Sequence, residues 1–157
     1  MFPEINSCVS VKRNEDFLVL ASLSGACAIF DLAHWHPTDL SNELLGSLAC
    51  RALDKSYQYT KKLRIDGMPM ESNYDEWVRL TKQKFNYKND RKMFNNMCSC
   101  SIIRKKSEII ITIPIHKKLK AWIGVLERKT ISDSLRFEEF GSEIRDSIDR
   151  AYAEEFS

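Results

Sequence analysis

Two stretches of this chain carry the same helical pattern. The segment LSNELLGSLACRALDKSY begins at Leu40, and the segment LRFEEFGSEIRDSIDRAY begins at Leu135. Aligned at this offset of 95 residues, they share Leu, Glu, Gly, Ser, Asp and Tyr at matching places. Apolar residues recur in both at spacings of three and four, as in an amphipathic helix. A chain with two such helices has two apolar stripes to bury, so we expect both helices to pack on one shared sheet.

The first of these helices is predicted from about Asn42 to Tyr57, with Asp39 or Ser41 as its cap. Its expected apolar face comprises Leu45, Leu48, Ala49, Ala52, Leu53 and Ser56. The equivalent face of the second helix comprises Phe137, Phe140, Ile144 and Ile148. Gly46 and Gly141 occupy the same place in the two copies. Because a glycine inside a helix costs about 1 kcal/mol relative to alanine, we expect another backbone to approach closely at Gly46.

The remaining segments predict a third helix, a short helical piece and six strands. The third helix starts at Asn73, with core contacts expected at Tyr74, Trp77, Val78, Leu80 and Phe85, and the short piece starts at Asp90. The predicted strands are CVSVKR from Cys8, FLVLASL from Phe17, ACAIF from Ala26, SCSIIRK from Ser99, EIIITIPI from Glu108 and AWIGVLE from Ala121. Short connections, such as the hairpin tip at Asn14 to Asp16, imply antiparallel neighbours.

The order of these elements predicts an α+β fold. We expect a single domain over residues 1–157, with a mainly antiparallel sheet packed by the two similar glycine-containing helices and the third helix. The N-terminus lacks the layout of a signal peptide, and the most apolar run, which starts at Phe17, is too short to span a bilayer. The five cysteines are scattered without a CxxC pair, which favours free thiols in a reducing compartment. We therefore expect a cytoplasmic protein that is not inserted in a membrane.

The histidines offer one candidate metal site. His34 and His36 would point to one face of a strand, and Cys27 lies upstream. A zinc site needs a third or fourth ligand, however, and His116 is the only other histidine. The favoured alternative is a loop in which Trp35 packs inward and the imidazoles lie in solvent or at the edge of the core. We predict neither a metal nor a cofactor.

Cys98 and Cys100 are the candidates for redox or nucleophilic chemistry. One residue between two thiols is neither the thioredoxin spacing nor the zinc-ribbon spacing, so buried thiols at a strand start are favoured. The chain contains no GxGxxG, GxxxxGK[ST], HExxH or GxSxG motif. We therefore expect a protein without enzymatic activity.

Basic residues gather at Arg104–Lys106, at His116–Lys120 and along KQKFNYKNDRKMF from Lys82. The last run mixes Lys and Arg with Phe and Tyr, as proteins that bind single-stranded nucleic acid do. The net charge is only +2, whereas dedicated nucleic-acid-binding domains are typically strongly basic. Direct nucleic-acid binding is therefore disfavoured, and a small RNA-binding or adaptor module without enzymatic activity stays as the alternative function.

Four segments, taken in order, resemble the immunity proteins of bacterial contact-dependent growth inhibition (CDI), the CdiI type. The segment NELLGSLACRALDKS is similar to the family's helix through Leu45, Gly46, Leu53 and Ser56. The segment NYDEWVRLTKQKFNYKNDRKMFNNM is similar to a Tyr-x-x-Trp helix with the basic stretch that follows it. EIIITIPIHKKLKAWIGV carries Pro114, which closes a strand in the family, and FEEFGSEIRDSIDRAY is similar to the second glycine-containing helix. Together they cover roughly Ser41 to Tyr152.

The resemblance implies an inhibitor that stays in the cytosol of the producing cell. Such a protein binds the C-terminal toxin domain of its cognate CdiA effector in a one-to-one complex, covers the toxin's active site and protects the cell. Many of these toxins are nucleases that act on tRNA, so a tRNase is the expected target. A ribonuclease presents a basic cleft, and carboxylates on an inhibitor can mimic phosphate and steer association. On this argument we nominate six toxin-binding residues: Glu71, Asp75, Glu76, Glu138, Glu139 and Glu143. The alternative role of these residues is to complement helix dipoles.

Overall fold

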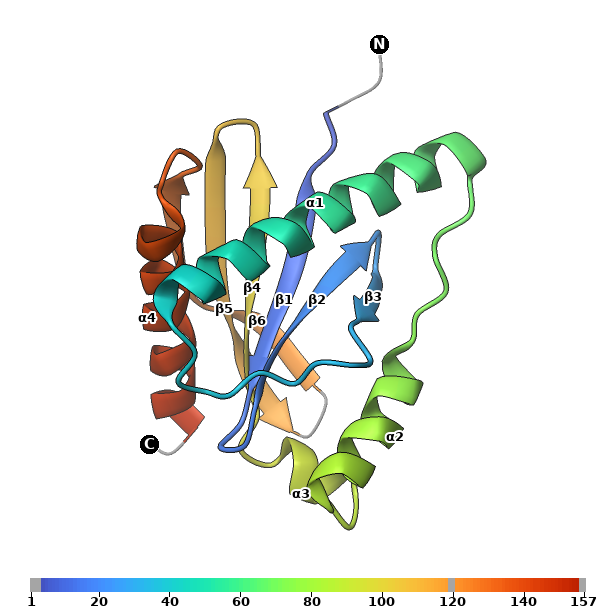
Figure 1. Ribbon diagram of the computed structural model, residues 1–157, viewed down its shortest axis with the longest axis vertical. Coiled ribbons are helices and arrows are strands. Elements are labelled where there is room, and N and C mark those ends of the chain that lie inside the picture. Colours follow the sequence, from blue (N-terminus) through green and yellow to red (C-terminus); the bar gives the residue numbers. More distant parts are fainter. Residues whose placement is uncertain (1–3, 119–120, 156–157) are drawn as a thin grey trace.

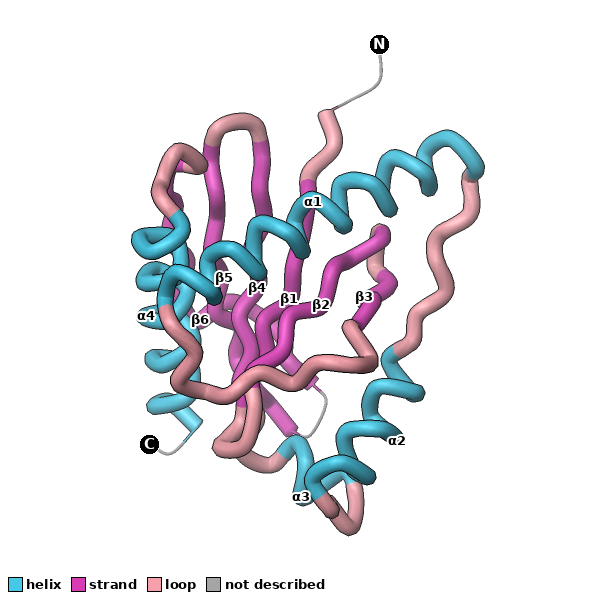
Figure 2. Tube along the Cα trace, in the orientation of Figure 1, coloured by secondary structure: helices cyan, strands magenta, loops and turns pink. Residues whose placement is uncertain are grey.

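The computed structural model describes residues 4–118 and 121–155. Their elements, drawn in Figure 1 and by type in Figure 2, follow one another along the chain as β1 (Ser7–Arg13), β2 (Leu18–Ser24), β3 (Cys27–Phe30), α1 (Asn42–Asp66), α2 (Tyr74–Phe85), α3 (Asp90–Phe94), β4 (Cys98–Lys105), β5 (Glu108–Lys118), β6 (Ala121–Ser132) and α4 (Phe137–Glu155). The predicted α+β class is confirmed. Within the described ranges, no helix is both long and apolar enough to cross a membrane.

The strands form one sheet in the order β3-β2-β1-β4-β5-β6, and every neighbouring pair is antiparallel. The tip of the first hairpin is fixed by Asn14, whose side-chain oxygen accepts hydrogen bonds from the N–H groups of Asp16 at 2.8 Å and Phe17 at 3.2 Å. The antiparallel hairpins predicted from short connections are confirmed. The central pairing of β1 with β4 joins strands about 90 residues apart in the sequence, and no hairpin turn connects them, so short connections could not predict it.

Helices cover both faces of the sheet, but unequally. α1 and α4 cross one face, as expected for the two similar helices, while α2, beside β3, and α3, next to α2, belong to the core on the opposite face (Figure 1). Side chains of β2 alternate between the two layers, since Leu18 belongs to the core under α1 and α4, and Val19 and Ala21 belong to the core under α2 and α3. Trp77 is the largest fully buried side chain of this second core.

Three elements extend beyond their predicted ends, and the short helix α3 ends at Phe94, before the predicted residues 95–97. α1 runs on to Asp66, because residues 58–66 hold no Gly or Pro, and it ends only at Gly67 in the left-handed conformation (φ 71°). β5 continues through Pro114, so this proline does not close the strand. It lies at a register shift in the β5–β6 ladder, where a residue without an N–H is tolerated. β6 likewise extends to Ser132.

Most residues of the predicted helical faces are buried. Within α1 the buried set is Leu45, Gly46, Ala49, Ala52, Leu53 and Ser56, and Leu48 is only half-buried. Phe137, the first residue of α4, is 48 % exposed and lies outside the buried stripe, which starts at Phe140. The close approach expected at Gly46 is confirmed, because a Cβ on this residue would overlap the backbone carbonyl of Phe137.

The sheet order is symmetric about its centre. β1-β2-β3-α1 and β4-β5-β6-α4 are two copies of one strand–strand–strand–helix unit, which we call the N-unit and the C-unit. Ser10 and Ser101 are paired in register at the pseudo-twofold axis that relates them. The repeat visible in the helices therefore extends to the whole unit, and α2 and α3 lie between the two units in the sequence.

Ion pairs between the units follow the same symmetry. Asp54 of α1 pairs with Arg104 of β4 at 2.9 Å, and Asp149 of α4 pairs with Arg13 of β1 at 3.0 Å. Asp54 and Asp149 are equivalent under the helix repeat. Arg13 and Arg104 each lie three residues beyond the central serine of their strand. Each helix is thus tied by an equivalent contact to the first strand of the other unit.

Candidate functional site

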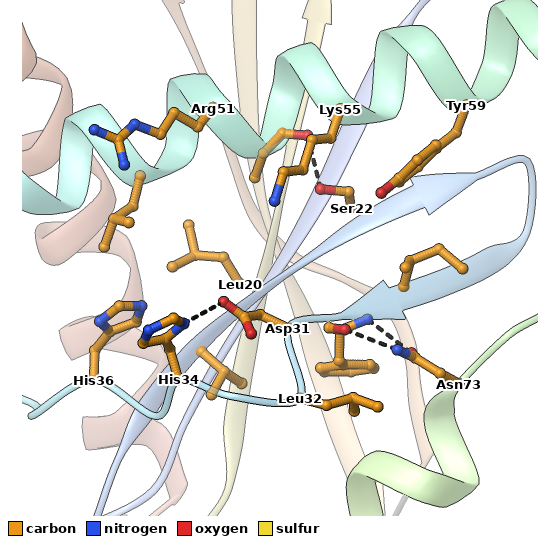
Figure 3. Close-up of a pocket in the computed structure, with 15 residues that line it drawn as sticks. Leu20, Ser22, Asp31, Leu32, His34, His36, Arg51, Lys55, Tyr59 and Asn73 are labelled. Atoms are coloured by element: carbon orange, nitrogen blue, oxygen red, sulfur yellow. Dashed lines mark hydrogen bonds and ion pairs between the residues drawn. The ribbon is translucent and has the colours of Figure 1, made fainter.

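A cavity of about 620 Å³ opens between α1 and the β2–β3 end of the sheet (Figure 3). This volume falls within the range of about 300–1,000 Å³ that is usual for binding sites. It is lined by Val19, Leu20, Ser22, Ile29, Phe30, Asp31, Leu32, His34, His36, Leu48, Arg51, Ala52, Lys55, Tyr59 and Asn73. The lining therefore combines an apolar sheet surface with polar and charged groups from α1 and from the 31–36 segment.

The cavity exists because β3 is short. After four residues the chain leaves the sheet at Asp31 and passes below α1 before that helix begins. His36 holds this segment in place, since its backbone exchanges two hydrogen bonds with Leu18, at 2.8 and 3.0 Å. Asn73 closes the outer edge of β3: its side chain accepts from the N–H of Phe30 and donates to the carbonyl of Phe30, both at 2.8 Å.

Cationic groups line the α1 side of the cavity. Arg51, Lys55 and Tyr59 are spaced four residues apart, so they project from one side of the helix. Figure 3 shows Lys55 and Tyr59 directed from α1 toward the sheet and Arg51 extended along the helix, and all three line the cavity. Across the residues that the structure describes, neither Arg51 nor Lys55 forms an ion pair. Both cations are therefore available to a ligand.

The opposite side of the cavity carries one carboxylate, which is already engaged. Asp31 contacts the ring of His34 at 2.7 Å and accepts a hydrogen bond from the N–H of Ala33 at 2.8 Å. Partial burial alone would raise the pKa of Asp31, but these two hydrogen bonds, with smaller contributions from the charges of His34 and Lys55, lower it. His36 stacks against His34 with ring centroids 6.3 Å apart. Burial, together with the charge of His34, lowers the pKa of His36.

The loop interpretation of His34 to His36 is confirmed for its central residue. The indole N–H of Trp35 donates to Thr81 at 2.9 Å, and the ring packs against the core under α2 and α3. His116 belongs to β5, at the far side of the sheet from the 31–36 segment. Among the side chains described, no three His, Cys, Asp or Glu residues gather closely enough to hold a metal ion.

The candidate thiols are buried on β4. Cys98 and Cys100 face the core under α1 and α4, in line with the expected buried thiols. Burial raises the pKa of Cys100 to about 12, so it remains a thiol at neutral pH. A nucleophile or redox centre needs an accessible thiolate, which this position does not provide.

The basic runs do not converge on one surface. Arg104 is paired with Asp54, and Lys82 is paired with Asp90 at 2.8 Å. Lys106 lies in the β4–β5 turn, at one end of the sheet. Of the run from His116 to Lys120, residues 119–120 lie outside the described residues.

The six nominated carboxylates fall into two groups at opposite ends of the strand order. Asp75 and Glu76 lie on the first turn of α2, beside β3, and Glu71 lies in the segment just before it (Figure 1). The other three, Glu138, Glu139 and Glu143, lie on the first turns of α4. Three of the six form ion pairs: Glu76 with Arg79 at 2.6 Å, Glu139 with Arg136 at 2.7 Å and Glu143 with Lys129 at 2.7 Å. For Glu71, Asp75 and Glu138 no ion pair is found within the described part of the chain. The structure does not bring the six together into one patch.

A comparison with known protein families decides where this chain belongs. The family described as CdiI, CDI immunity protein, matches residues 7–151. The chain belongs to the CDI immunity protein family. The matched span runs from β1 into the last turns of α4, so it includes both units, the cavity and all six nominated carboxylates.

Relatives of this immunity protein share its sequence and its fold. The curated immunity protein CdiI-YPIII of Yersinia pseudotuberculosis serotype O:3 is 29 % identical over 134 residues, which cover 73 % of this chain and 76 % of the relative. A solved protein of unknown function from Neisseria meningitidis is 26 % identical, with a TM-score of 0.76 over 96 % of this chain and 98 % of the other. A solved CdiA-CT/CdiI toxin and immunity complex from Yersinia pseudotuberculosis has the same fold, with a TM-score of 0.76 over 94 % of this chain and 98 % of the matched chain, at 24 % identity.

The cavity of this immunity protein was not predicted from its sequence. The spacing of Arg51, Lys55 and Tyr59 on the non-apolar side of the first repeated helix was a usable signal. It could not be interpreted without the position of β3, because charges spaced four apart are equally typical of a solvent-exposed helix face.

Proposed function

We propose that this chain neutralises the C-terminal toxin domain of its cognate CdiA effector by binding it in a one-to-one complex. Membership of the CDI immunity protein family carries the proposal. The Yersinia complex adds support, because there a chain of the same fold is solved together with a CdiA toxin domain. In this account the protein acts in the cytoplasm of the producing cell, where it meets toxin delivered by siblings, and the toxin is a nuclease, with tRNA as the expected substrate class.

We further propose that the chain inhibits by binding alone, without turnover. Burial of the candidate thiols Cys98 and Cys100 supports this. An inhibitor of this kind acts stoichiometrically: one equivalent of the chain inhibits one equivalent of toxin, and any toxin in excess of this amount remains active. An enzyme acting on the toxin or its substrate would protect at far less than one equivalent.

The nominated carboxylates are proposed as toxin contacts in two alternative sets. A toxin domain that sits over the start of α2 meets Glu71 and Asp75, beside the cavity residue Asn73. A toxin domain that sits over the start of α4 meets Glu138 instead. Free carboxylates on either side would steer a basic nuclease cleft toward the inhibitor. Because the two sets lie at different ends of the sheet, we expect only one of them to affect binding strongly.

The function is tested by titrating the chain into an activity assay of the toxin domain encoded immediately upstream of this gene. Inhibition should rise linearly and be complete at one equivalent. Cells that express the same toxin domain should grow when they also produce this chain. Full toxin activity at excess chain would overturn the proposal. Protection at a small fraction of one equivalent would overturn inhibition without turnover. Salt-sensitive binding of tRNA alone, without toxin inhibition, would favour an RNA-binding module.

A further inference from the structure

In the C-unit, ion pairs bridge the space that is open in the N-unit, and only a smaller cavity of about 130 Å³ remains between α4 and β5–β6. Arg150 of α4 pairs with Glu127 of β6 at 2.6 Å, and Lys129 of β6 pairs with Glu143 of α4 at 2.7 Å. These two ion pairs join helix and third strand across the region that is equivalent to the cavity. Strand length explains part of the difference, since β6 has 12 residues and β3 has 4.

The symmetry identifies what the N-unit lacks. Lys55 is the equivalent of Arg150 under the helix repeat. In the strands, Ser22 pairs with Ile29, and its equivalent Ile113 pairs with Glu127. Ile29 therefore stands where the C-unit has the carboxylate that binds Arg150, so the N-unit keeps the cation and lacks its acid.

The charges around the cavity are consistent with the absence of a carboxylate at the position of Ile29. Arg51 and Lys55 face the cavity from α1, and neither forms a direct ion pair with an acid that the structure describes, although the charge of Lys55 acts on Asp31. The one lining carboxylate, Asp31, is bound to His34 and to the N–H of Ala33. Apolar side chains of β2 and β3 line the same cavity, and a carboxylate seated on them is partly shielded from water, which strengthens its interaction with the cations.

We propose that this cavity receives an acidic segment of the toxin domain, whose carboxylate pairs with Lys55 and Arg51 as Glu127 pairs with Arg150. The inference rests on the proposed function, because it names the group of the toxin that the immunity protein recognises. The apolar side chains of the same segment pack on Leu20 and Ile29. Cationic recognition at the cavity makes Arg51 and Lys55 determinants of which toxin is bound.

Charge reversal at the cavity tests the proposal. The variants Arg51→Glu and Lys55→Glu are titrated calorimetrically with the upstream toxin domain, and Lys61→Glu serves as control, since Lys61 is exposed on the same helix and does not line the cavity. Each cavity variant should weaken binding about 30-fold or more, and the control less than about threefold. The conservative variant Lys55→Arg should retain binding. Because Arg51 and Lys55 are exposed, unchanged melting temperatures are expected and are verified for each variant.

A second variant uses the symmetry directly. Ile29→Glu places on β3 the carboxylate that the C-unit carries, so it should satisfy Lys55 internally and exclude the toxin's acid. Ile29→Gln is the matched neutral control. Ile29→Glu should bind the toxin at least about tenfold more weakly than Ile29→Gln. Unchanged toxin affinity in Arg51→Glu, Lys55→Glu and Ile29→Glu, beside tight binding by the parent, would overturn this inference and leave the proposed function intact. Failure of the parent chain to bind the toxin would overturn both.

Discussion

Gly46 of α1 and Gly141 of α4 meet at the crossing of the two helices, each against the backbone of the other. A Cβ on Gly46 would overlap the carbonyl of Phe137, and a Cβ on Gly141 would overlap the carbonyl of Asn42. The four residues form two equivalent pairs under the repeat, so the contact is symmetric. The conformational cost of a glycine inside a helix is offset here by an approach that no other residue allows.

We predict that Gly46→Ala and Gly141→Ala each lower the free energy of unfolding by roughly 2 kcal/mol or more. The added methyl group forces the helices apart, and this outweighs the gain of about 1 kcal/mol in helix propensity. Denaturant titration measures the change. Gln58→Ala, on an exposed site of α1, is the control and should change stability by less than about 0.5 kcal/mol. A stabilised Gly46→Ala variant would contradict the close crossing.

Arg145 and Arg150 lie on the same helix but should differ strongly in their contribution to stability. Arg145 donates to the side chain of Asn42 at 2.7 Å, to the carbonyl of Thr38 at 3.0 Å and to the carbonyl of Leu40, which fixes the start of α1. We expect Arg145→Met to lower the free energy of unfolding by about 2 kcal/mol. Arg150 is 67 % exposed in its side chain, so Arg150→Met should cost less than about 1 kcal/mol. Equal losses in thermal or denaturant unfolding would refute this assignment.

Lys12 predicts a pH dependence of stability. It is 9 % exposed on β1, with its ammonium 3.4 Å from Ser99, and burial lowers its pKa from 10.5 to about 8. Between these two pH values the unfolded chain binds more protons, so Lys12 makes stability rise with pH there and adds no slope below pH 8. Cys100 acts in the opposite direction above pH 9, because its pKa is raised from 9.0 to about 12.

A substitution isolates the contribution of Lys12. Lys12→Met should raise the free energy of unfolding at pH 7 by roughly 3 kcal/mol, and this advantage over the parent should shrink as the pH is raised from 8 toward 10. Urea titrations of parent and variant at each pH from 7 to 10 give the difference. Lys62→Met, at an exposed site, should show a constant difference. An advantage of Lys12→Met that is independent of pH would contradict the lowered pKa.

The nominated carboxylates predict an effect on association rate. Charge reversal by lysine, either at both Glu71 and Asp75 or at Glu138, should slow association with the toxin domain about 3- to 10-fold at low salt. We expect this effect for only one of these two sets of residues. Stopped-flow binding at two ionic strengths measures this. Asp66→Lys, at the exposed end of α1, is the control for the change in net charge. If neither set has an effect, the carboxylates serve only their own helices.

The helices and hairpins were predictable from the sequence because each depends on local signals. The repeated apolar spacing predicted α1 and α4, and the glycine inside the first helix, Gly46, predicted that another backbone approaches closely. The repeat of the strands was missed, although Ser10 and Arg13 in β1 match Ser101 and Arg104 in β4. Two identities in a seven-residue strand are too few to detect, whereas the helix copies extend over 18 residues.

The cavity could not be predicted because it depends on tertiary geometry. It requires β3 to end at Phe30 while α1 continues to Asp66, so that the helix extends past the strand that would have filled the space. The end of β3 depends on contacts that are distant in sequence, such as the hydrogen bonds between Phe30 and Asn73. α1 ends at a local signal, Gly67, but the position of this end relative to β3 depends on the tertiary fold. The cations of α1 suggest a function only in the light of the repeat, because Arg150, the equivalent of Lys55, forms an ion pair and Lys55 does not.

Tight binding of one toxin domain by this chain is measured by an isothermal calorimetric titration with the upstream CdiA toxin domain. We expect a single transition with a stoichiometry of one and a dissociation constant below the micromolar range, as stable inhibitory interfaces of about 1,600 Å² commonly reach. The absence of binding heat at several temperatures, with no co-migration of the two proteins on size exclusion, would contradict it.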